Sequence, residues 1–189
     1  MGRVLSREAL AAAIAADRSA GRSIAFANGC FDLLHVGHVR YLKAAAREAD
    51  RLIVAVNDDR SVAGLKGARR PILPEADRAE LVAALRVVSY VVVFGDATVE
   101  RLLQLIKPDV HCKGTDYTVD TVPERAVVAA YGGRTAIVGD PKSHATRELL
   151  ARIAATKDEP GTPNDERRTT NDEPRTANHE RRTTKDDSR

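Results

Sequence analysis

Residues 28–38 read Asn-Gly-Cys-Phe-Asp-Leu-Leu-His-Val-Gly-His, and this stretch decides the fold. The five residues before it, Ser-Ile-Ala-Phe-Ala at 23–27, are mostly apolar and predict a buried strand. After it, apolar residues at 39, 42, 46 and 49 recur at helical spacing, with basic residues at 40, 43 and 47 on the other side. The stretch is therefore predicted to join a strand to a helix, which is where α/β proteins bind phosphate.

Two histidines and a glycine lie at the start of this predicted helix. His38 falls in the first turn, where free backbone N–H groups and the positive end of the helix dipole attract anions. His35 can face the same anion, and Gly37 has no side chain to keep phosphate oxygens from the backbone. Two other interpretations stay open. The pair can be half of a zinc site, although His111, His144 and the cysteines do not follow metal-ligand spacings around it. Both rings can also be merely hydrogen-bonded in a turn.

Further along the chain, four short apolar runs rich in β-branched residues predict the remaining strands, at 51–57, 90–94, 109–113 and 134–138. Helical patterns separate them at 79–88, 99–106, 123–131 and 146–155, and an amphipathic helix at about 6–19 precedes the first strand. This alternation predicts an α/β fold, a Rossmann-like, doubly wound parallel sheet of five strands. In such sheets ligands bind beyond the carboxyl ends of the strands.

The composition predicts one folded domain and a short appendix. Nearly all the apolar residues precede residue 156, and a domain of ~150 residues buries roughly 70% of its unfolded surface. From residue 157 the chain is a charged seven-residue repeat without apolar seam positions, which excludes a coiled coil and predicts disorder. We therefore expect a folded domain at 1–155 and a disordered tail at 156–189.

Charge and hydropathy exclude several classes of partner. The net charge of +3 comes without a basic cluster, which argues against nucleic acid. No run approaches the ~20 apolar residues of a membrane span, and the first residues do not follow a signal-peptide pattern. Cys30 and Cys112 have no partner spacing, so we expect a reduced, cytoplasmic protein without a metal site of its own.

The histidine stretch resembles the signature of the cytidylyltransferase-like nucleotidyltransferases, Gly-x-Phe-Asp-x-x-His-x-Gly-His between a strand and a helix. All six positions are present, and a match of this length in the predicted context is far more specific than a lone glycine-rich loop. The resemblance implies that His35 and His38 are catalytic. It implies nucleotide binding by Gly29, Cys30, Phe31 and Gly37.

Two further segments narrow the resemblance. A Lys66-Gly67 pair follows the predicted strand at 51–57, and Lys-Gly-Thr-Asp-Tyr at 113–117 ends the strand at 109–113. Together they look like the adenylyltransferase domain of the heptose 1-phosphate adenylyltransferases, over about residues 23–153. The resemblance implies transfer of AMP from ATP to a heptose 1-phosphate, giving ADP-heptose and pyrophosphate for lipopolysaccharide or another surface glycan. Two alternatives remain, a cytidylyltransferase for glycerol 3-phosphate or another alcohol phosphate, and a catalytically weakened nucleotide-binding module.

The same resemblance implies roles for residues outside the histidine stretch. Lys66 would be catalytic on a mobile loop, although a solvated loop is the reading that composition alone favours. Arg78 would bind substrate, and a helix-capping ion pair is equally open. Asp32 is interpreted as a turn former that bonds local amides. The other implied residues are Asn57 for substrate and Lys113, Gly114, Asp116 and Thr146 for nucleotide.

The sequence departs from the resembled family at the last helix, and we also expect a bound ion and protein partners. Relatives carry Ser-Thr-Thr or Ser-Thr-Ser at the last helix, whereas this chain has Ala145, Thr146 and Arg147, which keeps only the central hydroxyl and predicts weaker nucleotide binding.

Mg²⁺ would be held mainly through the triphosphate. We also expect a homodimer. Because the sugar kinase that many relatives carry is missing, a separate sugar kinase should supply the substrate.

Overall fold

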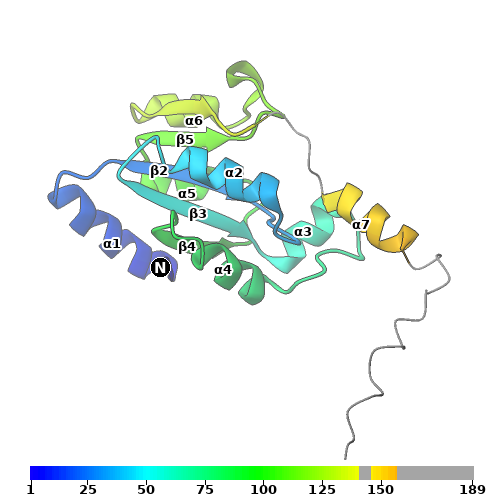
Figure 1. Ribbon diagram of the computed structural model, residues 1–189. Coiled ribbons are helices and arrows are strands. Elements are labelled where there is room, and N and C mark those ends of the chain that lie inside the picture. Colours follow the sequence, from blue (N-terminus) through cyan, green and yellow to red (C-terminus); the bar gives the residue numbers. More distant parts are fainter. Residues whose placement is uncertain (141–145, 157–189) are drawn as a thin grey trace, which may run out of the picture.

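The five short runs described above and one two-residue segment form the six parallel strands of a central sheet, in the order β1-β4-β3-β2-β5-β6 (Figure 1). The computed structural model describes residues 1–140 and 146–156. The strands are β1 (Arg3–Val4), β2 (Ile24–Gly29), β3 (Arg51–Asn57), β4 (Tyr90–Phe94), β5 (Val110–Lys113) and β6 (Arg134–Ile137). The helices are α1 (Arg7–Ser19), α2 (Val36–Ala45), α3 (Asp59–Lys66), α4 (Glu75–Ala83), α5 (Glu100–Ile106), the 3₁₀ turn η1 (Val119–Thr121), α6 (Arg125–Ala130) and α7 (Thr146–Ala155).

The predicted α/β fold with a doubly wound parallel sheet is confirmed, and each of the five predicted strands is present. The structure adds a sixth strand, β1, which pairs with the start of β4 at the edge of the sheet. β1 has only two residues, both exposed, so it leaves no hydrophobic pattern in the sequence.

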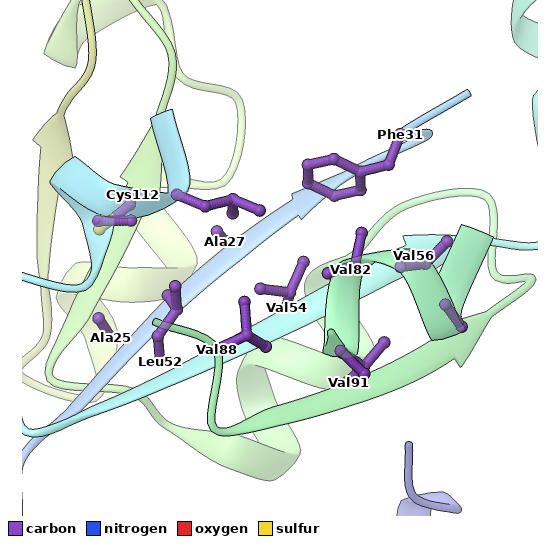
Figure 2. Packing of buried hydrophobic residues seen from close by; sticks show 14 of the residues in the cluster. Ala25, Ala27, Phe31, Leu52, Val54, Val56, Val82, Val88, Val91 and Cys112 are labelled. Carbon is purple, nitrogen blue, oxygen red and sulfur yellow. The ribbon is translucent and has the colours of Figure 1, made fainter. Parts of the chain in front are cut away.

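Helices cover both faces of the sheet, and side chains of alternate residues along each strand enter different cores. Ala25 and Ala27 of β2 face α2 and α4, where they pack with Val54, Leu42 and Val82, as Figure 2 shows for part of this cluster. The intervening Phe26 faces α1, α5 and α6 and packs in a second buried cluster. Small residues on β2 leave room for α2, whose first turn therefore lies close to the carboxyl end of β2.

Two predictions about the segments after β3 need correction. Lys66 is the last residue of a helix, α3, where the sequence predicted a flexible loop. Asp58 caps this helix by accepting a hydrogen bond from Ser61 N at 2.7 Å, and Val62 buries its inner face. The helix predicted at 79–88 is α4, which begins earlier, after Pro74, and ends at Ala83. Acidic residues favour this earlier start because they complement the N-terminal end of the helix dipole.

The strand order places a topological switch point at β2. From β2 the chain adds β3 and then β4 on one side, and it later adds β5 and β6 on the other. The loops after β2 and β5 therefore diverge, and such a crevice at the carboxyl edge is where ligands bind in doubly wound sheets. The predicted tail, apart from Thr156, lies outside the described residues, as do His144 and Ala145. Within the described ranges, no helix has the length and apolar character needed to cross a membrane.

Candidate active site

The two signature histidines lie at the start of α2 and stack on each other. Their ring centroids are 3.8 Å apart with an interplanar angle of 30°. His35 is the N-cap, and its Nδ1 accepts a hydrogen bond from Gly37 N at 3.2 Å. Nδ1 of His38, in the first turn as predicted, accepts from His35 N at 3.3 Å. The two side chains thus form a reciprocal capping box, in which each ring bonds a backbone amide of the other's turn.

These bonds determine the tautomer of both rings. A backbone N–H can only donate, so each Nδ1 is unprotonated and each neutral ring carries its hydrogen on Nε2. Burial lowers the pKa of His38 to about 4, and the neighbouring His35 and Lys66 act in the same direction. His38 is therefore a neutral imidazole at neutral pH. Its Nε2–H is a hydrogen-bond donor, suited to a phosphoryl oxygen beside the helix N-terminus.

Asp32 connects the histidine stretch to the segment after α3. Its fully buried carboxylate accepts from Arg70 Nη1 at 2.6 Å, from Ile72 N at 2.9 Å and from Leu73 N at 3.3 Å. The predicted role in local turn bonding is therefore wrong, because the bonded amides lie about 40 residues further along the chain. The backbone carbonyl of Asp32 also accepts from Thr146 Oγ1 at 3.1 Å. Asp32 thus joins three segments that border the histidines.

The residues on either side of Asp32 have unusual backbone conformations. Phe31 and Leu33 have φ values of 48° and 55°, in the left-handed region that few non-glycine residues adopt. The Phe31 ring is buried and lies 5.3 Å from the His38 ring, in a tilted arrangement. Phe31, predicted to bind nucleotide, thus packs against His38 and supports it. Gly29, at the end of β2, lies beside the same ring, because a Cβ there would lie 3.3 Å from Phe31.

The predicted residues Cys30, Asn57 and Lys66 gather on the β3 side of the histidines. Cys30 Sγ lies 4.0 Å from Asn57 Oδ1, and Asn57 Nδ2 donates to Ser61 Oγ at 3.3 Å. Burial raises the pKa of the Cys30 thiol, so it remains protonated at neutral pH. Lys66 is exposed, and its charge acts on both His38 and Cys30. We expect this exposed ammonium to reach an anion bound to the histidines.

Arg78, predicted to contact substrate, is instead fully buried in the protein. Its Nη1 donates to the backbone carbonyls of Cys30 and Asn57, at 2.6 and 2.7 Å. Nε donates to Leu73 O at 3.0 Å, and Nη2 to Asp59 Oδ1 at 2.7 Å. A guanidinium used in this way is a clamp between the ends of β2 and β3. We therefore assign Arg78 a positioning role, in place of the substrate contact that we expected.

The Lys-Gly-Thr-Asp-Tyr segment lies on the other side of β2, at the carboxyl end of β5. Lys113 is buried, with its Nζ 3.2 Å from Asn28 Oδ1 and 3.3 Å from Glu124 Oε1. Gly114 lies against Asp116, since a Cβ on the glycine would be 3.1 Å from Asp116 Oδ1. The ring of Tyr117 covers the ammonium at 5.4 Å from its centroid. The two predicted groups of residues thus flank the same strand at the switch point.

Several residues around the site were missed by the sequence analysis. Asn28 and Glu124 bond Lys113, and Arg70 bonds Asp32. Asn28 directly precedes the signature, which was the available signal for it. Glu124 and Arg70 left none, because charged residues in loops and at helix ends are usually exposed.

Comparisons with known proteins agree with this geometry. The model of the cytidylyltransferase-like family matches residues 26–179. Bifunctional protein HldE of Geotalea uraniireducens is 44% identical over 151 residues, covering 80% of this chain and 31% of that protein. Bifunctional protein HldE of Pseudomonas fluorescens is 47% identical over 150 residues, covering 79% of this chain and 32% of that protein. The chain thus spans about a third of the length of these curated relatives.

A solved structure extends the agreement to the backbone. The crystal structure of the lipopolysaccharide core biosynthesis protein from Thermoplasma volcanium superposes with a TM-score of 0.56 and 26% sequence identity, covering 65% of this chain and all of that one. Fold, histidine geometry and family match concur, and the chain belongs to the cytidylyltransferase-like family of nucleotidyltransferases.

Proposed function

We propose that this chain transfers AMP from ATP to a heptose 1-phosphate, forming ADP-heptose and pyrophosphate. The observation that carries the proposal is the pair of segments flanking β2. The stacked histidines on one side are those expected of the family, and the Lys113–Tyr117 segment on the other has the sequence that resembles the heptose adenylyltransferases. The match covers about a third of the length of each bifunctional HldE protein, which fits a chain that corresponds to one of their activities.

The chemistry needs positioning more than it needs a base. A phosphate monoester is already anionic near neutral pH, and one of its oxygens would attack the α-phosphorus of ATP in line as pyrophosphate leaves. His38 Nε2–H would donate to oxygens on which negative charge develops, with His35 beside it. Lys66 would neutralise the departing pyrophosphate from the end of α3. Each part therefore stabilises charge at a different oxygen of the reacting groups.

The residues of the site fit a magnesium ion that arrives with the nucleotide. Among the described residues, no group of three or more histidines, cysteines and carboxylates is placed to hold a metal ion. The nearest carboxylate of the signature, Asp32, already accepts three hydrogen bonds. Mg²⁺ commonly keeps several waters and binds substrate phosphates, and when bound it would offset the charge of the triphosphate.

The proposal extends to the organisation of the protein. The catalytic domain would end near residue 155, and the repeat at 156–189 would not take part in catalysis. The active form would be a homodimer, as in many symmetric enzymes. A separate sugar kinase would supply the 1-phosphate, and a cytoplasmic location would give access to ATP and this substrate.

Pyrophosphate release tests the proposal directly. The full chain with Mg²⁺ should release pyrophosphate from ATP with a heptose 1-phosphate, and not from CTP with glycerol 3-phosphate. Activity with CTP and an alcohol phosphate would replace the proposed reaction by a cytidylyl transfer on the same histidines. If no pyrophosphate is released with any pair, including other sugar 1-phosphates, the remaining alternative is a catalytically weakened nucleotide-binding module. Only the changed residues around Thr146 favour that alternative.

A further inference from the structure

Four polar side chains meet where β2 and β5 lie side by side, and the histidine signature includes none of them. Asn28 Oδ1 lies 3.2 Å from His111 Nε2 and 3.2 Å from Lys113 Nζ. Glu124 accepts from Lys113 through Oε1 and lies 3.2 Å from it through Oε2. His111, Lys113 and Glu124 are all buried, so their interactions are with each other more than with water. The cluster is a connected network that ends at the amide of Asn28.

The chemistry of the donors determines which way this amide lies. An ammonium group can only donate, so the Asn28 atom next to Lys113 must be the carbonyl oxygen. His111 Nε2 contacts the same oxygen and must therefore carry the ring hydrogen. Burial, together with the charge of Lys113, lowers the pKa of His111 to about 3, which keeps the ring neutral. A flipped amide would place its NH₂ group against the ammonium, so one orientation is selected.

This selection leaves the NH₂ group of Asn28 directed away from Lys113 and His111. Asn28 is half-buried, and Nδ2 makes no hydrogen bond to another described residue. Asn28 also pairs with Ala55 in register, one residue before the carboxyl end of β2, and is followed by Gly29. The amide donor therefore lies at the switch point, between the histidine segment and the Lys113 segment.

The pairing of the Lys113 charge also indicates that Lys113 orients Asn28 and that Asn28 faces the ligand. Its ammonium is matched by the Glu124 carboxylate, and Tyr117 covers it on another side. A paired, buried ammonium adds little net charge toward a ligand, but it can hold a neighbouring group in place. The nucleotide-binding role expected for Lys113 is thus better described as an action through Asn28.

We propose that Asn28 is a ligand-binding residue whose Nδ2 donates to a phosphoryl oxygen, and that Glu124, Lys113 and His111 are positioning residues that hold its amide. This inference rests on the proposed function, because the phosphoryl group belongs to the nucleotide or to the sugar phosphate. Both sources offer the same oxygen acceptor, and binding measured with each one separately distinguishes them.

The test replaces only the donor. Asn28→Asp keeps an oxygen toward Lys113 and His111 but turns the NH₂ group into a second, negatively charged oxygen. Isothermal titration of the full chain with MgATP, and separately with a sugar 1-phosphate, should show binding of one ligand at least ~10-fold weaker, as expected for a lost hydrogen bond to a charged group. The melting temperature should stay at the wild-type value, since both buried bonds survive. Gln104→Glu is the matched control, because it makes the same change at an exposed position of α5 and should alter neither quantity.

Two results would overturn the inference and leave the proposed function standing. One is an Asn28→Asp protein that binds both ligands as tightly as the wild type and Gln104→Glu. The other is a ¹⁵N spectrum in which His111 carries its hydrogen on Nδ1, since the network requires Nε2–H. If the wild type binds MgCTP and glycerol 3-phosphate in place of MgATP and a sugar 1-phosphate, the proposed function fails. The Asn28→Asp comparison then decides the inference with those ligands. A wild-type protein that binds no phosphate ligand would refute both the inference and the proposed function.

Discussion

Replacing Arg78 by lysine should destabilise the protein strongly, although the charge is kept. The guanidinium is fully buried and bonds three backbone carbonyls, those of Cys30, Asn57 and Leu73, in addition to Asp59. A single ammonium nitrogen cannot occupy the positions of Nε, Nη1 and Nη2 together. We expect lysine to keep about two of these four bonds and to leave the other acceptors unsatisfied.

The size of the loss follows from the bonds that disappear. Hydrogen bonds to a charged group contribute about 1.5–3 kcal/mol each, so two of them give about 3–6 kcal/mol. Domains of this size unfold with about 5–15 kcal/mol in total. Their melting temperature falls by about 2–4 °C per kcal/mol, which predicts a drop of roughly 6–24 °C for Arg78→Lys.

Urea unfolding followed by far-ultraviolet circular dichroism measures this loss, because the chain has no tryptophan for fluorescence. Arg101→Lys is the control, since Arg101 is 81% exposed and its contact with Asp96 is 3.6 Å long. We expect the control to change the free energy of unfolding by less than about 1 kcal/mol. Arg78→Lys should also raise KM, because Cys30 and Asn57 border the site. An Arg78→Lys protein as stable as the control would refute the clamp.

Three further predictions use other parts of the structure. His38→Ala should lower turnover at least ~100-fold without changing the circular dichroism spectrum, as for loss of one transition-state donor, and wild-type turnover would exclude a catalytic role. The folded pKa values of His38 and His111, about 4 and about 3, lie below the ordinary 6.5. The unfolded chain therefore binds more protons below pH 6.5, and the free energy of unfolding should fall as the pH is lowered from about 6.5 toward 4. Urea titrations should show a smaller fall in His111→Leu, and an identical fall would contradict the buried neutral ring. Deleting residues 156–189 should leave turnover and melting temperature unchanged, and loss of either would show that the repeat belongs to the catalytic unit.

The sheet and the start of α2 could be predicted because each depends on local sequence. The runs in β2, β3 and β4 are mostly apolar, those in β3 and β4 are rich in β-branched residues, and short apolar runs of this kind indicate buried strands. Helix α3 was missed because glycine and serine in so short a segment favour a loop, whereas the structure stabilises it through Asp58 and the buried Val62. Local propensity was overridden there by one cap and one packed side chain.

The network around Asn28 could not be predicted in the same way, because it depends on the order of the strands. His111 and Lys113 reach Asn28 only because β5 pairs with β2 on the side opposite β3. That order brings together residues more than 80 positions apart. Asp32 and Arg70 show the same limit, with an ion pair between a fully buried carboxylate in a turn and a half-buried guanidinium in a distant segment. Sequence motifs indicated which residues carry chemistry, whereas strand order determines which residues orient them.

The sequence left zinc binding, turn formation and anion binding as interpretations of the signature histidines. In the structure the turn bonds orient both rings in the way that the proposed anion binding needs. Capping uses Nδ1 of both rings, and it is this use that places the hydrogen on Nε2. A histidine released from the cap would lose its preferred tautomer and its stacking partner as well as its position. Asn28 follows the same logic on the opposite side of β2, where Lys113 takes the oxygen and leaves the donor. At both places a buried or local bond occupies one polar atom of a side chain that has two. The second atom is thereby oriented before any ligand binds, and such preorganisation lowers the reorganisation needed during phosphoryl transfer.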